Sequence, residues 1–340
     1  MNFFKSKILF RCDAANTPEI GTGHVFRSLT IARLLKNKFK LKNKDIVFLV
    51  RSKNKFAKAL DILKYSKFKV VRINKSNLRI NSTEEAKYLQ KNSANLLILD
   101  RLGKIKKGFI LKIQSYFKKK IIIDDSSMNR KLFDISLNPL IHNVRKLKNS
   151  YIGFSYNILP TFFSKINLIK ESNIFIFFGG YDKNNSTNKI LKFLNYRKVK
   201  LNFYLPEMIK KKINKKISNN KIFYFKNNQY LSALNKCDIS ITAGGLGLLD
   251  SIFMKKKVIC IPRYNHQLKN AKKIASKSEI NLLKVDDKDL EIKFKKIFKR
   301  IYKNIVYQKK IAKAYNTILS KNKMNKTVKL IYNVYEQSIN

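Results

Sequence analysis

Short apolar runs alternate with longer amphipathic stretches along most of the chain. Runs of this length that are rich in Ile, Val and Phe are typical of buried parallel strands, and the stretches between them have the length and spacing of crossover helices. The repeated order of strand and helix predicts an α/β fold with parallel sheets. The predicted strands are 7–11, 45–50, 69–73, 95–100 and 120–124 in the first half, and 173–178, 200–205, 221–225, 239–242 and 257–261 in the second.

The alternation is interrupted between residues 151 and 172 by an irregular segment that contains Pro160. A chain of 340 residues is about right for two domains, because domains run to roughly 100 to 200 residues. We therefore predict an N-terminal Rossmann-like domain over 1–160 and a C-terminal, nucleotide-binding Rossmann-like domain over 170–290, which face a central cleft. Residues 291–340 are predicted to form a basic helical extension.

The strongly basic composition does not identify a partner. The 74 Lys and Arg residues exceed the 21 Asp and Glu residues, which gives a formal net charge of +53. Proteins that bind nucleic acid gather their basic residues on one face or arm, whereas these lysines are spread along the whole chain. We therefore predict no specific nucleic-acid partner, although a positive field attracts an anionic nucleotide substrate. For the basic extension we favour packing, with contact to an anionic membrane surface as the alternative.

The cysteines and the apolar runs indicate a compartment. Cys12, Cys237 and Cys260 are odd in number, form no CxxC pair and lie in or beside apolar runs, as buried thiols of a reducing compartment do. No apolar run approaches the 18 or so residues of a membrane span, and the first ten residues lack the apolar core of a signal peptide. These features predict a cytoplasmic protein. Nothing in the sequence predicts an oligomeric state.

Seven of the ten glycines fall in three clusters, and each cluster follows a predicted strand or precedes a predicted helix. In an open parallel sheet, ligands bind at the carboxyl ends of the strands, where the first amide groups of a helix favour a phosphate. The clusters therefore predict substrate-binding loops, with ordinary strand-to-helix turns as the alternative. They are Gly21 with Gly23, Gly179 with Gly180, and Gly244 and Gly245 with Gly247.

His24 is the candidate catalytic residue of the first cluster. Apolar residues at helical spacing from Val25 to Leu35 turn one face of the following helix toward the core, and leave His24 and Arg27 near its exposed start. The positive end of the helix dipole and the surrounding lysines favour a neutral imidazole, which can act as a general base. A capping or core histidine is the alternative.

The third cluster suits a nucleoside diphosphate. Its glycines allow a pyrophosphate to approach the start of a helix, and Asp250, further into that helix, can bind ribose hydroxyls. The cluster lacks the GxxxxGK[ST] pattern of a P-loop and is a poor match to GxGxxG, so neither ATP nor NAD is favoured.

The remaining polar candidates are weaker. His142 lies in a Lys- and Asn-rich loop and fits a structural role, whereas His266 is a candidate for substrate contact. Asp287 and Asp289 flank Lys288 as in the DxD of metal-dependent sugar transferases, but acidic residues at a helix start explain them. Because the sequence also lacks a grouping of Cys and His, we predict no metal and no other cofactor.

Taken in order, these motifs resemble one known family. They resemble the UDP-sugar hydrolases of pseudaminic-acid biosynthesis, which share the GT-B fold with the glycosyltransferase that completes lipid-linked peptidoglycan precursors. The resemblance spans residues 7 to 285, but Asp250 stands where a Glu is usual and the extension beyond Leu290 has no counterpart. The matching stretches are Arg11 to Asp13, Gly21 to Arg27, Leu99 and Asp100 with Gly103, Ile123 to Asp125 with Asp134 and Asn138, Gly153 to Tyr156, Phe178 to Asp182, Ala243 to Gly245 with Asp250, and Pro262 through Gln267, Asn270 and Ala271.

The resemblance implies a GT-B-like enzyme that hydrolyses a UDP-linked 2,4-diacetamido-2,4,6-trideoxyhexose with inversion, without a metal. His24 would be the base for the attacking water, and Asp13 would orient that water or bind sugar. A glycosyltransferase of the same fold, in which His24 deprotonates an acceptor hydroxyl for surface polysaccharide synthesis, is one alternative, and a noncatalytic nucleotide-sugar or nucleic-acid binder is another. The implied substrate-binding residues are Gly21, Gly23, Arg27, Gly179, Gly180, Gly244, Gly245, Asp250, Gln267 and Asn270.

Overall fold

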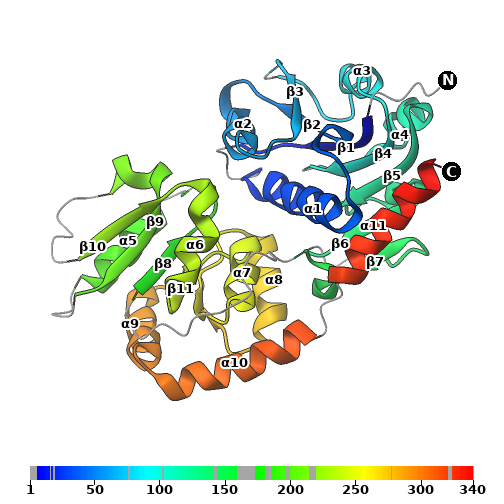
Figure 1. Cartoon of the computed structure of the whole chain (residues 1–340). Coiled ribbons are helices and arrows are strands. Elements are labelled where there is room, and N and C mark those ends of the chain that lie inside the picture. Colours follow the sequence, from blue (N-terminus) through cyan, green and yellow to red (C-terminus); the bar gives the residue numbers. More distant parts are fainter. Residues whose placement is uncertain are drawn as a thin grey trace. The chain divides into compact units, whose positions relative to one another are not determined.

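Two parallel β-sheets organise the chain, one in each of two units (Figure 1). Unit 1 comprises Met1–Ile158 and Asn322–Asn340, and unit 2 comprises Leu159–Lys321. The computed structural model describes residues 6–15, 17, 20–75, 77–101, 103–140, 144–158, 173–180, 182, 185–195, 200–213, 220–276, 278–320 and 324–339.

Unit 1 contains a seven-stranded sheet in the order β3-β2-β1-β4-β5-β6-β7, and every neighbouring pair in it is parallel. This order, in which the chain first builds outward on one side of β1 and then on the other, is that of a Rossmann-like sheet. Its elements are β1 (Ser6–Cys12), α1 (Gly23–Phe39), β2 (Ile46–Arg51), α2 (Lys58–Leu63), β3 (Lys69–Ile73), α3 (Thr83–Lys91), β4 (Ala94–Asp100), α4 (Lys107–Ile113), β5 (Phe117–Ile123), β6 (Ile135–Asn138), β7 (Ser150–Ile152) and α11 (Met324–Ile339).

Unit 2 contains a six-stranded parallel sheet in the order β10-β9-β8-β11-β12-β13. Its elements are β8 (Asn173–Phe177), α5 (Ser186–Leu194), β9 (Asn202–Pro206), β10 (Lys221–Phe225), α6 (Tyr230–Asn235), β11 (Ile239–Thr242), α7 (Leu246–Phe253), β12 (Lys257–Cys260), α8 (Asn265–Ala275), β13 (Asn281–Leu282), α9 (Leu290–Ile301) and α10 (Ile305–Ser320).

The α/β fold with parallel sheets is confirmed, and each of the ten predicted strands is present to within three residues at either end. The sequence did not indicate β6, β7 and β13, which have four, three and two residues, because such short strands give no recognisable apolar run. β7 also enters the segment 151–172 that was predicted to be irregular, and Pro160 lies outside the described residues.

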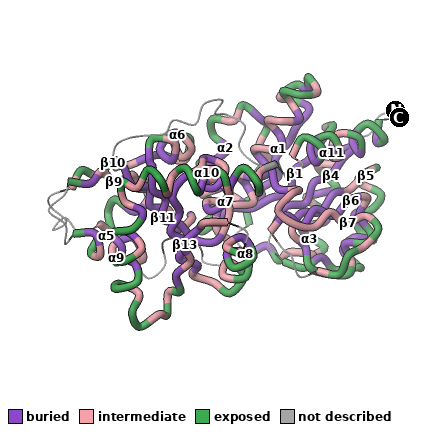
Figure 2. Tube along the Cα trace, turned by 90° about the horizontal axis from the view of Figure 1, so that it is seen from below, coloured by how far each residue is buried: buried purple, intermediate pink, exposed green. Residues whose placement is uncertain are grey.

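The two faces of the unit 1 sheet are covered by different helices. On β1, Ile8 and Phe10 pack into the core that includes α1 and α11, whereas Leu9 packs into the core that includes α3 and α4. This alternation follows from the two-residue repeat of a strand. All seven residues of β4 are buried, and this strand lies within the purple interior of unit 1 in Figure 2.

The basic segment 291–340 is divided between the units. Helices α9 and α10 belong to unit 2, where Phe294 and Phe298 of α9 enter the core. Helix α11 belongs to unit 1, where Val328 and Ile331 pack against the same core as α1. Within the described part of the chain, no helix combines the length and the apolar character needed to cross a membrane.

Candidate functional site

The candidate site of unit 1 lies at the carboxyl ends of three neighbouring strands. β1, β4 and β5 are adjacent and parallel, so the residues that end or follow them meet at one edge of the sheet. Asp100 ends β4, Asp124 follows β5, and α1 begins after the loop that follows β1. Between β1 and β4 the order of the strands reverses direction, which is where open α/β sheets bind their ligands.

The first helical turn of α1 carries His24 to this edge. His24 Nδ1 lies 2.7 Å from Asp100 Oδ1. Burial alone raises the pKa of Asp100, but the Arg27 guanidinium and the hydrogen bond from His24 outweigh it and lower this pKa to about 2. An ionised carboxylate only accepts hydrogen bonds, so the ring proton of a neutral His24 resides on Nδ1 and the lone pair on Nε2. The His24 side chain is 16% exposed, and the arrangement suits a general base.

Arg27 holds the carboxylates of this edge together. Its Nε and Nη2 donate to the two oxygens of Asp100, at 2.9 and 2.6 Å, and its Nη1 donates to Asp124. Arg27 lies one turn after His24 on the same face of α1, so the helix presents both side chains to Asp100. The predicted position of Arg27 at an exposed helix start is wrong: its side chain is 3% exposed, because both carboxylates lie on the core side.

The loop before α1 is closed by backbone hydrogen bonds. The Ala15 amide donates to the Gly21 carbonyl at 2.8 Å, and the Gly21 amide donates to Thr17 at 3.2 Å. Gly21 has a φ of +58°, which other residues adopt at a cost, whereas a Cβ added there meets no atom within 4 Å. Gly21 is therefore needed for the backbone conformation that leads the loop into α1, which begins at Gly23.

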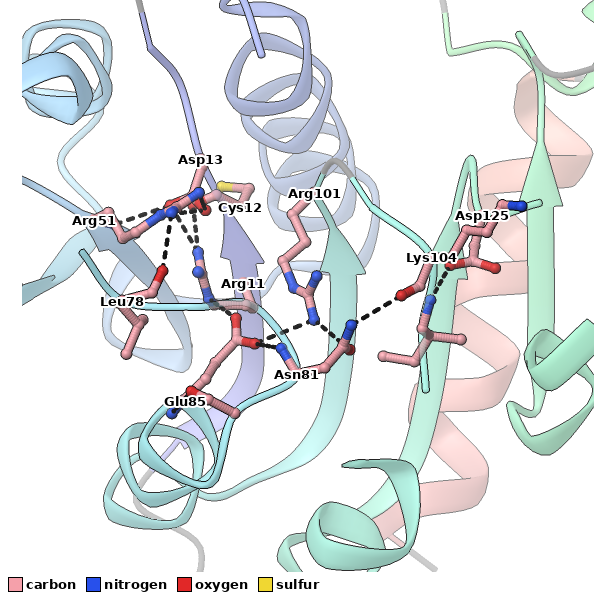
Figure 3. Close-up of polar contacts among 12 residues, drawn as sticks. Arg11, Cys12, Asp13, Arg51, Leu78, Asn81, Glu85, Arg101, Lys104 and Asp125 are labelled. Atoms are coloured by element: carbon pink, nitrogen blue, oxygen red, sulfur yellow. Dashed lines mark hydrogen bonds and ion pairs between the residues drawn. The ribbon is translucent and has the colours of Figure 1, made fainter. Parts of the chain in front are cut away.

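Asp13, the second predicted catalytic residue, contacts arginines. Its Oδ1 accepts from Arg11 Nη1 and from the Arg51 amide, and its Oδ2 accepts from Arg51 Nε (Figure 3). The side chain is buried, and these arginines lower the pKa of Asp13 although burial opposes them. The carboxylate that contacts His24 is Asp100, whereas both carboxylate oxygens of Asp13 accept hydrogen bonds from arginines.

Unit 2 has its own set of loops at the carboxyl edge of its sheet. The strands β8, β11 and β12 are adjacent and parallel, and they are followed by Gly179 with Gly180, by Gly244 with Gly245, and by Arg263. The second and third glycine clusters of the sequence therefore lie on neighbouring strands of one sheet. This edge is where a parallel sheet of this kind binds a nucleotide.

Gly244 and Gly245 differ in what surrounds them. A Cβ at Gly244 would lie 2.4 Å from the Gln267 carbonyl oxygen, so the first turn of α8 packs directly on this glycine. A Cβ at Gly245 meets no atom within 4 Å, and Gly245 is the residue before α7. The side of Gly245 that a Cβ would occupy is therefore open, directly before the first turn of α7, and the start of a helix favours a phosphate.

Arg263 is a residue of this edge that the sequence did not single out. It donates to the carbonyl of Phe178, and its Nη1 lies 3.7 Å from Asp182 Oδ1. A Cβ on Gly179, which has a φ of +91°, would lie 3.8 Å from Arg263 Nη2. Arg263 thus joins the loops after β8 and β12 and places a guanidinium against the glycine, which suits an anionic ligand. A basic residue two positions after the predicted strand 257–261 was the signal for it.

Asp250 lies on α7 and is half-buried. Its Oδ2 accepts a hydrogen bond from the Tyr230 hydroxyl at 3.1 Å. Burial raises the pKa of Asp250 to about 7, although the Tyr230 hydrogen bond opposes the shift. Tyr230 begins α6 and was not indicated by the sequence, because its proximity to Asp250 depends on how α6 and α7 pack.

The remaining predicted residues fall into three groups. Gln267 accepts a hydrogen bond from the Arg263 amide at 3.0 Å and packs against Gly244, and Asn270 lies one turn further along α8. His266 is exposed and stacks on Tyr264. His142 lies outside the described residues. Among the described residues, no group of three or more His, Cys, Asp and Glu side chains is placed to hold a metal ion.

In sequence, the chain is similar to an uncharacterized protein. No protein-family model matches the chain. It is 27% identical over 301 residues to the uncharacterized protein MJ1062 of Methanocaldococcus jannaschii, an alignment that covers 78% of this chain and 58% of the relative. The chain thus spans less than two thirds of the length of that relative.

Solved structures match almost the whole chain. MurG of Acinetobacter baumannii superposes with a TM-score of 0.65 at 13% identity, over 97% of this chain and 99% of its own. The spinosyn forosaminyltransferase SpnP has a TM-score of 0.65 at 10% identity, over 97% and 99%. The spinosyn rhamnosyltransferase SpnG, complexed with thymidine diphosphate, has a TM-score of 0.61 at 9% identity, over 96% and 99%.

These likenesses show that the chain has the GT-B fold of glycosyltransferases.

The matches also bear on the basic extension. Because they leave out only 3 or 4% of the chain, they include most of the segment 291–340. Most of the segment 291–340 is therefore matched in these structures, whereas its comparison with the UDP-sugar hydrolases stays a prediction.

Proposed function

We propose that this chain cleaves a nucleoside-diphosphate sugar and transfers the sugar to an oxygen nucleophile, with His24 as general base. The observation that carries the proposal is the hydrogen bond between His24 Nδ1 and the buried carboxylate of Asp100, at the ligand-binding edge of a GT-B unit. That bond leaves the Nε2 lone pair to accept a proton. The names of the structural neighbours, which are glycosyltransferases, favour the same chemistry.

The proposed reaction is a single displacement. The nucleophile oxygen bonds to the anomeric carbon, its proton passes to His24 Nε2, and the bond from that carbon to the phosphate oxygen breaks. The Asp13, Asp100 and Asp124 side chains are 1, 0 and 6% exposed, and each is held by an arginine, so none of them is placed to form a covalent sugar intermediate. One displacement inverts the anomeric configuration.

Unit 2 is proposed to bind the nucleoside diphosphate at the carboxyl edge of its sheet. The start of α7 after Gly245 and the Arg263 guanidinium supply donors and positive charge for the phosphates, and the Asp250 carboxyl is a candidate ligand for ribose hydroxyls. Gly179, Gly180, Gly244, Gln267 and Asn270 would complete this site. SpnG, whose structure contains thymidine diphosphate, is consistent with a ligand of this class.

The nucleophile distinguishes two candidate functions. The neighbours named as glycosyltransferases favour an acceptor hydroxyl and therefore a glycosyltransferase. For such an enzyme we propose a role in surface polysaccharide synthesis. The stretch from Gly21 to Arg27, followed by Asp100 and Asp124, favours water, because these residues carry the resemblance to the UDP-sugar hydrolases of pseudaminic-acid biosynthesis. In both cases we propose a cytoplasmic enzyme that uses UDP-sugars without a metal.

The test measures glycosyl transfer directly. The purified chain is incubated with UDP-2,4-diacetamido-2,4,6-trideoxyaltrose, without an acceptor, while UDP release and the anomeric proton signal are followed by NMR. His24→Gln is compared with Lys91→Gln, a change at an exposed lysine that ends α3. Release of UDP and an inverted free sugar, lost only in His24→Gln, supports the hydrolase. Release that requires added acceptor supports the transferase, and a chain that binds UDP but cleaves no UDP-sugar with any acceptor refutes both.

A further inference from the structure

A buried cluster of charged side chains lies beside the candidate site in unit 1 (Figure 3). Its members come from the ends of three strands and from α3, and they form a continuous set of ion pairs. Because a buried charge without a partner is costly, such a network fixes the geometry of the segments that it joins. The cluster consists of Arg11, Asp13, Arg51, Glu85 and Arg101.

Asp13 is the member of this cluster that belongs to the loop before α1. Its Oδ1 accepts from Arg11 Nη1 at 2.8 Å and from the Arg51 amide at 3.0 Å. Its Oδ2 accepts from Arg51 Nε at 2.9 Å and lies 2.8 Å from Arg51 Nη2. Both oxygens are therefore held against β1 and β2, which leaves Asp13 little freedom to move.

The loop transmits this restraint toward the base. Ala14 and Ala15, which follow Asp13, are fully buried, and the Ala15 amide donates to the Gly21 carbonyl. Gly21 leads through Thr22 into α1, whose second residue is His24. A shift of the loop at Asp13 would therefore move the first turn of α1 relative to β4, where Asp100 resides.

We propose that Asp13 is a positioning residue: its arginine contacts hold the loop before α1 so that His24 stays hydrogen-bonded to Asp100. The inference rests on the proposed function only where it predicts an effect on kcat, because the hydrogen bond between His24 and Asp100 can be observed without turnover. It assigns Asp13 a role through His24, without contact to water or sugar.

Glu85 provides a matched control within the same cluster. It is fully buried and accepts from Arg11 Nε at 2.9 Å and from the Asn81 amide at 2.7 Å, and it lies 3.1 Å from Arg101 Nη2. It belongs to α3, and its hydrogen bonds and ion pairs join it to Arg11, Arg101 and residues 81 and 82, away from the loop before α1. Glu85→Gln and Asp13→Asn thus each remove one buried charge from the cluster, but only Asp13→Asn loosens the loop.

The experiment observes the His24 ring by NMR in protein labelled at histidine. The chain has three histidines, so His24→Gln assigns the His24 signals by subtraction. In the wild type we expect a downfield Nδ1 proton, protected from exchange by the Asp100 carboxylate. We expect this signal to persist in Glu85→Gln and to exchange at least about tenfold faster in Asp13→Asn. An unchanged signal in Asp13→Asn, or equal loss in both variants, overturns the proposal.

A second variant and a kinetic measurement complete the test. Arg51→Gln removes one arginine from Asp13 but leaves Asp13 bound to Arg11 and to the backbone amide of residue 51. It therefore tests the same restraint if Asp13→Asn does not fold. Faster exchange of the His24 proton in this variant supports the proposal, and unchanged exchange refutes it. With an active substrate, Asp13→Asn should lower kcat by about tenfold or more, because small misplacements of a catalytic group are costly. The Kd for UDP should stay within about twofold, since the UDP site is proposed in unit 2. A normal NMR signal with no turnover in the wild type would refute the proposed function alone.

Discussion

His24 and Asp100 are joined by a 2.7 Å hydrogen bond from the start of α1 to the end of β4, and the same helix also secures the carboxylate. Arg27 and Ser28, one turn further along α1, both donate to Asp100. Residues three and four positions after His24 lie on its face of the helix, so one element presents the base and clamps its partner. The pair is therefore preorganised within unit 1.

We expect His24→Gln to abolish turnover while the protein stays folded. The side chain is partly exposed and its loss removes one hydrogen bond to a buried carboxylate, so the free energy of unfolding should fall by about 1 to 3 kcal/mol. Loss of a general base lowers kcat by roughly 10²- to 10⁴-fold. Steady-state kinetics and calorimetric titration with UDP check this together; a variant with normal kcat would exclude His24 as the base.

Asp100→Asn should destabilise the protein in a pH-dependent way. The folded pKa of Asp100 is about 2, below the usual value near 3.9, so its ionised form contributes stability above pH 4 that is lost as the pH falls toward 2. At pH 7 we expect a loss of roughly 2 to 4 kcal/mol, because Arg27 keeps only Asp124 as a charged partner. Urea unfolding at pH 7 and at pH 2.5 measures both, and an equal loss at the two values would contradict the assignment.

The sequence predicted the fold well where the apolar runs were long. The strands β1, β4 and β11 combine strong apolar runs with glycine or polar signals at their ends, and they were located correctly. The division of the basic segment 291–340 between the two units was not predictable. Helices α10 and α11 have similar lengths and polar faces, so their own sequences do not indicate which core each helix packs against. That choice is made by tertiary packing.

The candidate site was predictable in part. The glycine pair before α1 led to His24, because glycine is needed where φ is positive, as at Gly21. The sequence did not indicate which aspartate contacts His24, since Asp13 follows one strand and Asp100 ends another strand of the same sheet. What separates them is Arg51, which takes the Asp13 carboxylate, and Arg27, which brings Asp100 under His24; both are contacts across the fold.

Gly244→Ala and Gly245→Ala should separate packing from ligand binding. An added methyl at Gly244 would lie 2.4 Å from a backbone oxygen of Gln267, which cannot move aside cheaply, so we expect a loss of about 1 to 3 kcal/mol in stability. The methyl at Gly245 meets no protein atom within 4 Å and should leave the melting temperature unchanged, while it obstructs the approach of a phosphate. Thermal unfolding and UDP titration of both variants test this. Equal melting temperatures for both variants, or full UDP affinity in Gly245→Ala, would contradict it.

Asp250 should make the stability of unit 2 depend on pH near neutrality. Because burial raises its folded pKa to about 7, the folded state binds the proton more tightly than the unfolded state, whose value is near 3.9. The stability from this group is therefore fully present below pH 4 and is lost as the pH rises through 7. Asp250→Asn keeps the shape and lacks the charge. We therefore expect its free energy of unfolding to exceed that of the wild type by on the order of 1 kcal/mol at pH 8, and by clearly less at pH 5. Tyr230→Phe removes the donor that stabilises the carboxylate and should move the transition to higher pH. Melting temperatures of the three proteins between pH 5 and 8 decide the matter, since parallel curves for wild type and Asp250→Asn would mean that Asp250 stays charged in the fold.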